Sequence, residues 1–439
     1  MTAGSALSAK KPLRVAFAGL GTVGAGCLDL LSRNASLIAQ RAGREIVATA
    51  FSARDQNRDR GVSTRGLAWF SDPAALAAQA DADVIVEAIG GSEGPARATV
   101  EAALRAGRPV VTANKALLAH HGAELARLAA EKDVDLRFEA AVAGGIPIIK
   151  ALREGLAGNR IERVAGILNG TCNFILSTMR ETGREFADVL AEAQKLGYAE
   201  ADPSFDVDGV DAAHKLALLA SVAFGCAVDF DAVKIEGIRH VSALDIAYAE
   251  ELGYRIKLLG AATMTPDGLD QRVQPCMAPL SSPIAHVEGV FNAVLVIGDA
   301  VGRSFYQGRG AGAGPTASAV VADLIDVARG LRLPTFGVPV ENLRRSNALA
   351  AGAARGSYYI RLMVLDRPGV IADVAAALRD HQVSLEAMLQ RGRAPGETVP
   401  VVLTTHETDE GALRSALDRI ARLDSVVEPP RLIQILQEL

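Results

Sequence analysis

Short apolar segments alternate with amphipathic helical segments in the first third of the chain. Strands are predicted at RVAFAG, EIVATAF, DVIVEAIG, PVVTAN and VDLRFEAAV, with helices from Thr22 and around Ala96 to Ala106. This alternation is typical of βαβ units, which form a parallel sheet with helices on both faces. We therefore predict an α/β domain over residues 14–149, preceded by a flexible tail over residues 1–13.

The pattern changes after residue 149, where helices become longer. A helical repeat of apolar positions comprises Phe186, Val189, Leu190, Ala193 and Leu196, and strands are predicted at 161–168 and 290–297. We assign residues 150–334 to a second, α+β domain. A linker is expected over residues 335–355, because a run of small residues, AGAARGS, ends near Gly356.

The last part of the chain predicts strand, helix, strand, strand, helix and strand in that order. The segments are YYIRLMVL, VIADVAAALRDH, VSLEAM, TVPVVLTT, ALRSALDRIARL and RLIQIL. This order is a complete βαββαβ module, so residues 356–439 are expected to form a third domain.

Composition narrows the class of function. The 439 residues allow about three domains. A net charge of -5, with both signs interspersed, provides no surface for nucleic acid or anionic lipid. We therefore expect small-molecule chemistry, with neither a nucleic-acid nor a membrane partner.

Cysteine usage and hydropathy indicate the compartment. Four cysteines lie far apart without a CxxC pair, which argues against a disulfide framework or structural zinc. The longest apolar run, near Leu216 to Val228, is shorter than the roughly 18 residues that a bilayer requires. A cytoplasmic location is the expectation.

A glycine-rich turn follows the first predicted strand. In Gly19-Leu20-Gly21-Thr22-Val23-Gly24, the strand and helix context supports a dinucleotide-binding loop. The first glycine would make the turn, the second would admit the pyrophosphate, and the third would let helix and strand pack. The bland alternative is a glycine-rich turn in an α/β fold.

The sequence after the second strand bears on the choice of cofactor. There, Ser52-Ala53-Arg54-Asp55 places a basic and an acidic residue side by side. Arg54 favours a 2'-phosphate and hence NADP, whereas Asp55 leaves NAD open. A solvated surface arginine is the alternative interpretation of Arg54.

Two further segments carry candidate chemistry. Asn114-Lys115 follows a strand at the sheet edge where α/β folds bind ligands, although a capping asparagine with a solvated lysine would look the same. In EAAVAGGIP, Glu139 precedes glycines that expose carbonyl oxygens. This is a candidate oxygen-only cation site, and an interdomain hinge is the alternative.

The densest polar segment runs from Gly197 to Lys215 as GYAEADPSFDVDGVDAAHK. The helix predicted from Asp211 to Phe224 is otherwise apolar, and its polar residues fall within about 120° of one another. Asp211 and Lys215 are either a surface i, i+4 pair or face a cleft. In a cleft, a partly desolvated lysine beside carboxylates could donate a proton.

Cys172 is the candidate for a covalent nucleophile. Dehydrogenases that oxidise aldehydes through a thioester use such a thiol. No histidine is placed by the sequence to activate it, so a packed core residue is the alternative.

These residues resemble homoserine dehydrogenases of the bacterial three-domain type over nearly the whole chain. The matching segments are GLGTVG, TANKALLA, FEAAVAGGIPII, ILNGTCNFIL, GYAEADPSFDVDGVDAAHKL, GRGAGAGPTASAV and LDRPGV. The resemblance implies a Rossmann-type NAD(P)-binding domain, a catalytic and dimerisation domain, and an ACT-like regulatory domain. It also implies a homodimer or homotetramer.

The resemblance further implies an activity and roles for individual residues. The reaction is NAD(P)-dependent interconversion of L-aspartate 4-semialdehyde and L-homoserine, on the route to threonine, methionine and isoleucine. Lys215 would donate the proton beside Asp211, and Lys115 would lie near substrate and nicotinamide. The remaining implied contacts are substrate at Glu200 and Asp206, cofactor at Gly21, Thr22, Val23, Arg54 and Gly312, and sodium at Glu139 with the carbonyls of Val142, Gly144 and Ile146.

One segment departs from the family pattern. Where many relatives have an RDxxKxR-like sequence, this chain has Arg54-Asp55-Gln56-Asn57-Arg58-Asp59-Arg60. The sequence thus leaves NADP preferred and NAD open.

Two alternatives to the dehydrogenase are a thioester-forming semialdehyde dehydrogenase that uses Cys172 and a non-catalytic amino-acid sensor. Threonine is the expected effector, near the turn from Asp366 to Val370.

Overall fold

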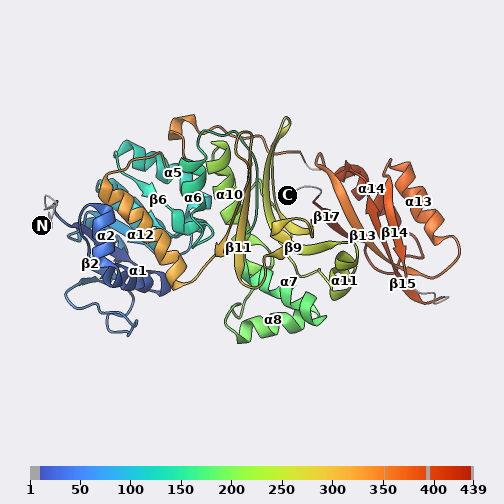
Figure 1. Ribbon diagram of the computed structural model, residues 1–439, viewed down its shortest axis with the longest axis horizontal. Coiled ribbons are helices and arrows are strands. Elements are labelled where there is room, and N and C mark those ends of the chain that lie inside the picture. Colours follow the sequence, from blue (N-terminus) through green and yellow to red (C-terminus); the bar gives the residue numbers. More distant parts are fainter. Residues whose placement is uncertain (1–9, 351, 392–395, 437–439) are drawn as a thin grey trace, which may run out of the picture. The chain divides into compact units, whose positions relative to one another are not determined.

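The computed structural model describes residues 10–350, 352–391 and 396–436 (Figure 1). The chain divides into two compact units. The first comprises Met1–Gly170, Asp211–Val233 and Val290–Ser346, and the second comprises Thr171–Val210, Lys234–Gly289 and Asn347–Leu439. The units interleave along the chain, so the three consecutive domains remain an interpretation of the sequence. Of the predicted tail, residues 1–9 lie outside the described part, and Leu13 already opens a strand.

A six-stranded parallel sheet organises the first unit. Its strands are β1 (Leu13–Ala18), β2 (Ile46–Ser52), β3 (Ala68–Phe70), β4 (Val84–Glu87), β5 (Val110–Thr112) and β6 (Leu136–Arg137). They lie in the order β3-β2-β1-β4-β5-β6. The predicted α/β fold is confirmed. Strand order reverses between β1 and β4, and ligands of such sheets bind there, at the carboxyl ends of the strands.

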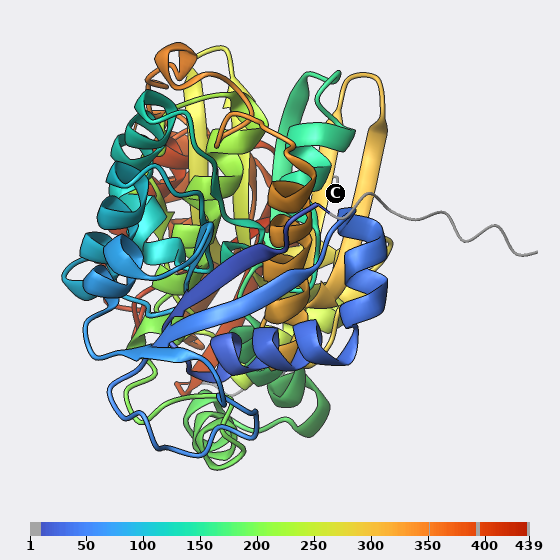
Figure 2. The ribbon, with the colours of Figure 1, turned by 90° about the vertical axis from the view of Figure 1, so that its left-hand side faces the viewer.

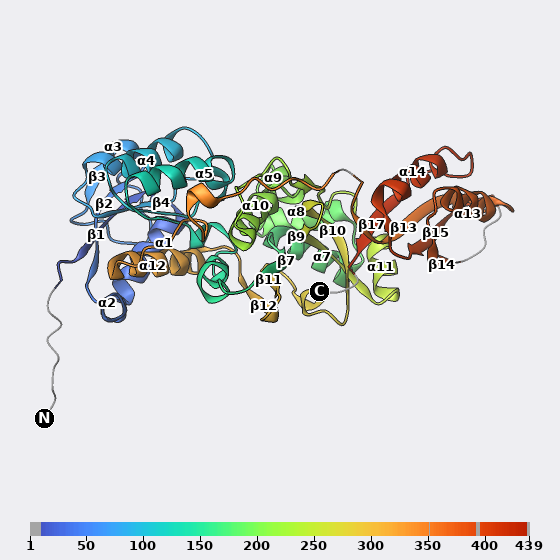
Figure 3. The ribbon, with the colours of Figure 1, turned by 90° about the horizontal axis from the view of Figure 1, so that it is seen from above.

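Helices cover both faces of this sheet, as Figure 3 shows. One face carries α3 (Pro73–Gln79), α4 (Pro95–Arg105) and α5 (Lys115–Glu131), and the other carries α1 (Thr22–Arg33), α2 (Ala35–Ala42) and α12 (Ala313–Arg329). In Figure 2, α12 appears in orange next to α1 in blue. The prediction placed this layer entirely within residues 14–149. It omitted α12, because sequence separation hides such a contact.

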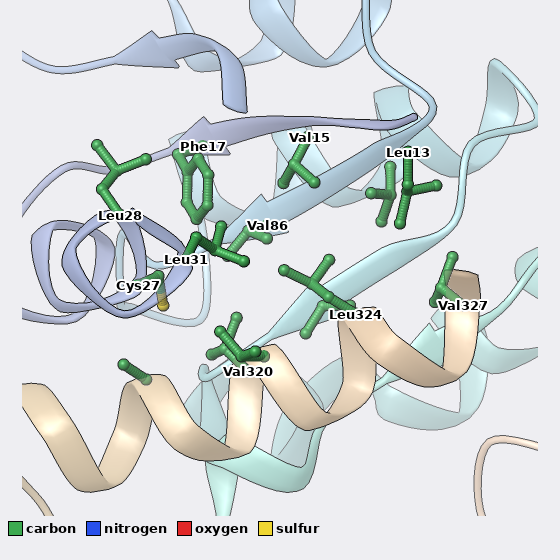
Figure 4. Packing of buried hydrophobic residues seen from close by; sticks show 14 of the residues in the cluster. Leu13, Val15, Phe17, Cys27, Leu28, Leu31, Val86, Val320, Leu324 and Val327 are labelled. Atoms are coloured by element: carbon green, nitrogen blue, oxygen red, sulfur yellow. The ribbon is translucent and has the colours of Figure 1, made fainter. Parts of the chain in front are cut away.

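The apolar pattern explains why α12 packs there. Val15 and Phe17 of β1 and Val86 of β4 are fully buried. Figure 4 shows Val320 and Leu324 pointing from α12 toward this side of the sheet. Spaced four residues apart, the two side chains lie on the same helix face. Burying each such side chain stabilises the fold by roughly 1.5–3 kcal/mol. This free energy favours the packing of α12 against the sheet.

The rest of the first unit contains strands β7 (Ile161–Ile167), β11 (Phe291–Gly298) and β12 (Gly302–Arg309) and helix α10 (Val210–Phe224). The strands pair antiparallel in the order β12-β11-β7. The strand predicted over VDLRFEAAV is wrong beyond Arg137. A 3-10 turn (Glu139–Ala141) follows, and α6 (Ile148–Lys150) begins soon after, because the buried Glu139 carboxylate accepts its backbone amides.

The second unit begins with helices and a long hairpin. Its elements are α7 (Gly170–Thr182), α8 (Phe186–Lys195), α9 (Ser204–Val207), β8 (Lys234–Ile235), α11 (Ala243–Glu251), β9 (Tyr254–Thr265) and β10 (Gly268–Pro279). Strands β9 and β10 pair antiparallel over their full length. Gly268 turns the hairpin with a φ of 141°, a conformation that L side chains rarely adopt.

The predicted βαββαβ module is confirmed in the same unit. It comprises β13 (Arg355–Leu365), α13 (Val370–Asp380), β14 (Leu385–Gln390), β15 (Thr398–Thr405), α14 (Glu410–Ile420) and β17 (Arg431–Ile435), with the short β16 (Thr408–Asp409) before α14. Strand order is β9-β10-β17-β13-β15-β14. Because β17 pairs with both β10 and β13, the module continues the hairpin's sheet. Both helices pack on one face of its strands (Figure 1).

The segment predicted as a linker is partly ordered by contacts. It holds a 3-10 turn (Val340–Asn342), and isolated bridges join Cys226 to Arg344 and Leu269 to Ala348.

Among the described helices, none combines the length and the unbroken apolar sequence that a membrane span would need.

Candidate active site

The glycine-rich turn after β1 has the geometry of an anion site. Gly19 has a φ of 98°, and a Cβ there would lie 2.6 Å from the Ala88 carbonyl oxygen. A Cβ on Gly24 would lie 2.3 Å from the Gly19 carbonyl oxygen, whereas one on Gly21 would meet nothing within 4 Å. Thus two glycines are required by packing, and Gly21 faces open space. This matches the division of roles that the sequence predicts for a pyrophosphate loop.

Two helix N-termini meet beside this turn. Gly21 precedes α1 and Gly312 precedes α12, and neither helix has a side-chain cap. The first amides of a helix lack internal partners and favour an anion. A Cβ on Gly26 would lie 2.7 Å from the Ala313 carbonyl oxygen, so this glycine brings the two helices together. The sequence analysis missed Gly26, because nothing in the sequence pairs α1 with α12.

The arginines after β2 differ in their surroundings. Arg54 is exposed. Arg60 instead donates from Nε to the Leu20 carbonyl oxygen at 3.0 Å, and its guanidinium lies 5.9 Å from the Phe51 ring centroid. Arg60 therefore holds the carbonyl side of the glycine-rich turn, whereas Arg54 and Arg58 are exposed and accessible to a ligand.

Lys215 and Asp211 form a buried pair rather than a surface salt bridge. The residues are 8% and 5% exposed. Lys215 Nζ donates to Asp211 Oδ2 and to the Leu168 carbonyl oxygen, each at 2.7 Å. An ammonium group has three N–H donors, so these two bonds leave one for a ligand oxygen. The surface alternative is wrong for this pair.

Lys115 joins the same cluster from a different element. It is the first residue of α5, and its Nζ lies 3.2 Å from Asp211 Oδ1. Asn169 donates from Nδ2 to Asp211 Oδ2 at 2.9 Å. Burial works to raise the pKa of Asp211, but the charges of Lys215 and Lys115 together lower it below its usual range. Asp211 is thus a carboxylate that orients two cations.

A buried histidine lies on the same helix. The His214 ring is 4.4 Å from the Phe230 ring and 5.3 Å from the His120 ring, centroid to centroid. Burial, and next the charge of His120, lower the pKa of His214 to about 4. His214 is therefore neutral at neutral pH and adds no third cation beside Asp211.

The acidic loop belongs to the second unit, where flanking helices hold its main chain. Glu200 is exposed and Asp206 is half-buried. Gln194 Nε2 donates to the Glu200 carbonyl oxygen at 3.0 Å, and Thr171 Oγ1 donates to the Tyr198 carbonyl oxygen at 2.7 Å. The backbone is anchored from both sides, while Glu200 as a residue is exposed.

Cys172 also anchors this loop. Its thiol is fully buried and donates to the Asp206 carbonyl oxygen at 3.2 Å. A thiol enclosed in this way is not accessible as a nucleophile, since attack requires an exposed thiolate. The interpretation of Cys172 as a packed residue is the one that the structure favours.

The candidate cation loop is built around Glu139. Its carboxylate accepts from the Ile149 and Lys150 amides at 3.0 and 2.7 Å. Burial, and next the neighbouring Asp323, raise the pKa of Glu139 to about 7. Gly144 has a φ of 46°, and a Cβ there would lie 2.4 Å from the Gly310 carbonyl oxygen. Oxygen donors and a buried, like-charged carboxylate pair suit a hard cation.

The described part of the chain holds no cluster of three or more His, Cys, Asp or Glu side chains that could bind a metal ion. A cation at this loop would depend on main-chain carbonyl oxygens as well as on Glu139.

Comparison with known families covers most of the chain. Residues 147–325 match the family described as homoserine dehydrogenase, residues 19–139 match the homoserine dehydrogenase NAD binding domain, and residues 358–424 match the ACT domain. Homoserine dehydrogenases of Neisseria gonorrhoeae and Pseudomonas aeruginosa are 47% and 48% identical to this chain. Each alignment covers 97% of this chain and 99% of the relative.

Solved structures give the same result. A homoserine dehydrogenase from Thiobacillus denitrificans is 47% identical, with a TM-score of 0.93 over 98% of this chain and 99% of its own. A hyperthermophilic archaeal homoserine dehydrogenase, solved in complex with NADPH, is 27% identical, with a TM-score of 0.63 over 73% of this chain and 99% of its own. Neither the thioester-forming enzyme nor the non-catalytic sensor is favoured by these matches. The chain belongs to the homoserine dehydrogenase family and is an oxidoreductase that acts on CH–OH groups.

Proposed function

We propose that Lys215 is the proton donor of this reaction, in which L-aspartate 4-semialdehyde is reduced to L-homoserine. The observation that carries the proposal is the buried Lys215 ammonium, held by Asp211 Oδ2 and the Leu168 carbonyl oxygen at 2.7 Å. Bound NADPH supplies the hydride for the aldehyde carbon. Lys215 protonates the alkoxide oxygen that develops there, and in the reverse direction it takes the proton back.

Asp211 and Lys115 set the electrostatics of this step. Asp211 orients Lys215, because its Oδ2 accepts a hydrogen bond from Lys215 Nζ at 2.7 Å. Lys115, one-third exposed, is available to an anionic group of the substrate. The family resemblance assigns the substrate's ammonium and hydroxyl groups to Glu200 and Asp206.

Turnover with the purified chain tests the proposed reaction, the interconversion of L-aspartate 4-semialdehyde and L-homoserine. We expect steady oxidation of L-homoserine with NADP and no dependence on phosphate. Phosphate-dependent acyl transfer would instead support the thioester route through Cys172.

We further propose that NADP is the preferred cofactor and that Arg54 contacts its 2'-phosphate. A charge-assisted contact of this kind is absent with NAD. Arg54→Ala should therefore raise the KM for NADP about tenfold or more and leave the KM for NAD within about twofold, in steady-state assays with each cofactor. An equal loss with both cofactors would contradict the assignment. The control is Arg60→Ala, which removes a bond to the Leu20 carbonyl oxygen and should affect both cofactors.

We propose that the loop from Glu139 to Ile146 binds sodium through the Glu139 carboxylate and the carbonyls of Val142, Gly144 and Ile146. A ligand that binds only the folded state raises stability by mass action. Sodium chloride should therefore raise the Tm by a few degrees relative to choline chloride at equal ionic strength, and Glu139→Gln should abolish this difference.

The exposed Glu131 provides the matched control for that measurement. Glu131→Gln should retain the full effect of sodium. Equal Tm values in the two salts for the unaltered chain would refute the site.

We propose that the ACT module binds threonine at the turn from Asp366 to Val370. Gly369 precedes α13 with a φ of 99°, and a Cβ there meets nothing within 4 Å, so a carboxylate has access to the helix amides. Threonine should inhibit partially, because coupling between sites is typically 1–3 kcal/mol. Gly369→Ala should relieve the inhibition in a titration of activity with threonine.

A point variant is a sharper test than truncation near Gly356. Removing the module would also remove β17 from β10 and leave Arg272 without Glu410, to which it donates at 2.6 Å. Inhibition that persists unchanged in Gly369→Ala would exclude this turn as the effector site.

We also infer a cytoplasmic homodimer or homotetramer, as the family resemblance implies. Sedimentation equilibrium of the purified chain distinguishes the two assemblies. A monomer at micromolar concentration would contradict both.

A further inference from the structure

Glu87 is a fully buried carboxylate that the proposed reaction does not use. It is the last residue of β4, at the switch point of the parallel sheet, and it is 0% exposed. Its Oε1 accepts from the amides of Ile89 and Gly90 at 2.8 and 3.2 Å. Burial raises the pKa of Glu87. Removing a carboxyl group from water costs free energy, so a fully buried one requires an explanation.

The other carboxylate oxygen of Glu87 belongs to a series of hydrogen bonds that ends at α5. Thr112 Oγ1 donates to Glu87 Oε2 at 2.5 Å and accepts from the Asn114 amide at 3.0 Å. Asn114 Nδ2 lies 3.5 Å from Glu87 Oε1 and donates to the Gly91 carbonyl oxygen at 2.8 Å. Glu87, Thr112 and Asn114 therefore form one connected network, in which each member is buried.

This network ends at the first turn of α5. Asn114 is the N-cap of the helix, and its Oδ1 accepts from the Leu117 amide at 3.0 Å. Lys115 is the next residue, so the orientation of the cap determines where its side chain starts. From there, Lys115 Nζ reaches to 3.2 Å from Asp211 Oδ1.

We propose that Glu87 is a positioning residue that directs Lys115 toward Asp211 through Thr112 and Asn114. The inference rests on the role proposed for Lys115 in the reaction and deepens it. Glu87 is bonded to Thr112, the last residue of β5. It acts by fixing the end of β5 and the cap of α5, and so determines the distance between the two cations that share Asp211.

The network requires a carboxylate rather than an amide at position 87. Both carboxyl oxygens of Glu87 accept from the donors that surround them. A glutamine would turn its Nε2 toward Thr112 or toward the Ile89 and Gly90 amides, and one donor would lose its acceptor. An unsatisfied buried donor is costly, so the network would rearrange and Lys115 would move.

The test is a double-mutant cycle between Glu87→Gln and Lys115→Ala. Two changes that act through the same contact are not additive, whereas independent changes are. We expect Glu87→Gln to lower kcat/KM for homoserine about tenfold in the otherwise unaltered chain. In the Lys115→Ala background, the same change should cost less than twofold.

Two further variants protect the test against a folding defect. Thr112→Val removes the bridging hydroxyl at similar volume and should match the loss seen with Glu87→Gln, while Thr112→Ser keeps the hydroxyl and should restore most of the activity. Glu131→Gln makes the same chemical change at the exposed end of α5 and should behave as the unaltered chain. Circular dichroism establishes folding, and NADPH fluorescence measures cofactor binding.

The outcomes separate this inference from the proposed function. Normal kcat/KM in Lys115→Ala alone would contradict the role of Lys115, and with it the positioning role. Equal losses from Glu87→Gln in both backgrounds would show that Glu87 acts on another part of the site and overturn the inference alone. Unaltered activity in a folded Glu87→Gln, or equal activity in Thr112→Val and Thr112→Ser, would overturn it as well.

Discussion

Lys215→Ala should lower kcat by about 10²-fold or more while the chain remains folded and still binds NADPH. General acid catalysis by a positioned side chain contributes typically 10²–10⁴-fold. The two hydrogen bonds of Lys215, to Asp211 and to the Leu168 carbonyl oxygen, hold the ammonium in one orientation. The alanine variant removes this donor without disturbing the glycine-rich turn. Steady-state kinetics in both directions measures the effect.

The split between kcat and KM identifies the role. Loss of an interaction made in the transition state lowers kcat and kcat/KM together, whereas loss of uniform binding raises KM alone. Lys132, exposed at the end of α5, provides the control, and Lys132→Ala should leave both parameters unchanged. A folded Lys215→Ala variant with near-normal kcat would disprove the assignment.

Asp245→Asn should lower the free energy of unfolding by about 3 kcal/mol, the scale for breaking a buried ion pair from one side. Asp245 is 1% exposed and accepts from Arg361 Nε at 2.6 Å and from the Tyr359 hydroxyl at 3.0 Å. It also forms the capping box of α11 with Ser242. Removing the charge leaves the Arg361 guanidinium buried without its carboxylate. Urea unfolding of the full chain measures the loss.

Glu428 is the matched control for that measurement. Its carboxylate approaches Arg361 Nη1 at 3.9 Å, but its side chain is 56% exposed. Exposed pairs contribute about 0–1 kcal/mol, so Glu428→Gln should have little effect. A loss from Asp245→Asn no larger than that of the control would show that the buried pair does not hold α11 to β13.

Local patterns predicted most elements of the fold. The helix from Thr22 and the repeat from Phe186 were predicted where α1 and α8 begin, and the final βαββαβ order is confirmed. These predictions rest on periodicity and on turn residues, which act over a few residues. The strand through VDLRFEAAV failed for the same reason. Apolar residues continue past Arg137, but Glu139 bonds to amides ten residues away and bends the chain.

The sequence predicted some contacts of the candidate site and missed others. Asp211 and Lys215 share one helix, so their spacing already implied a pair, and only burial decided between a surface bridge and a cleft. Lys115 joins them from a helix about a hundred residues earlier, a contact that no local pattern contains. The contacts of Glu87, Gly26 and Arg60 were not predicted, because each acts on a segment that lies far along the chain.

The sequence by itself determined the family, the parallel sheet, the dinucleotide turn and the identity of the charged side chains. These depend on residue type and short spacing, which the chain carries independently of its fold. Only the tertiary structure decided which charges are buried, that α12 completes the first sheet, and that β17 joins the C-terminal module to β10. Burial, helix packing and strand pairing arise between segments distant in sequence, where desolvation and close packing, rather than local propensity, determine the free energy.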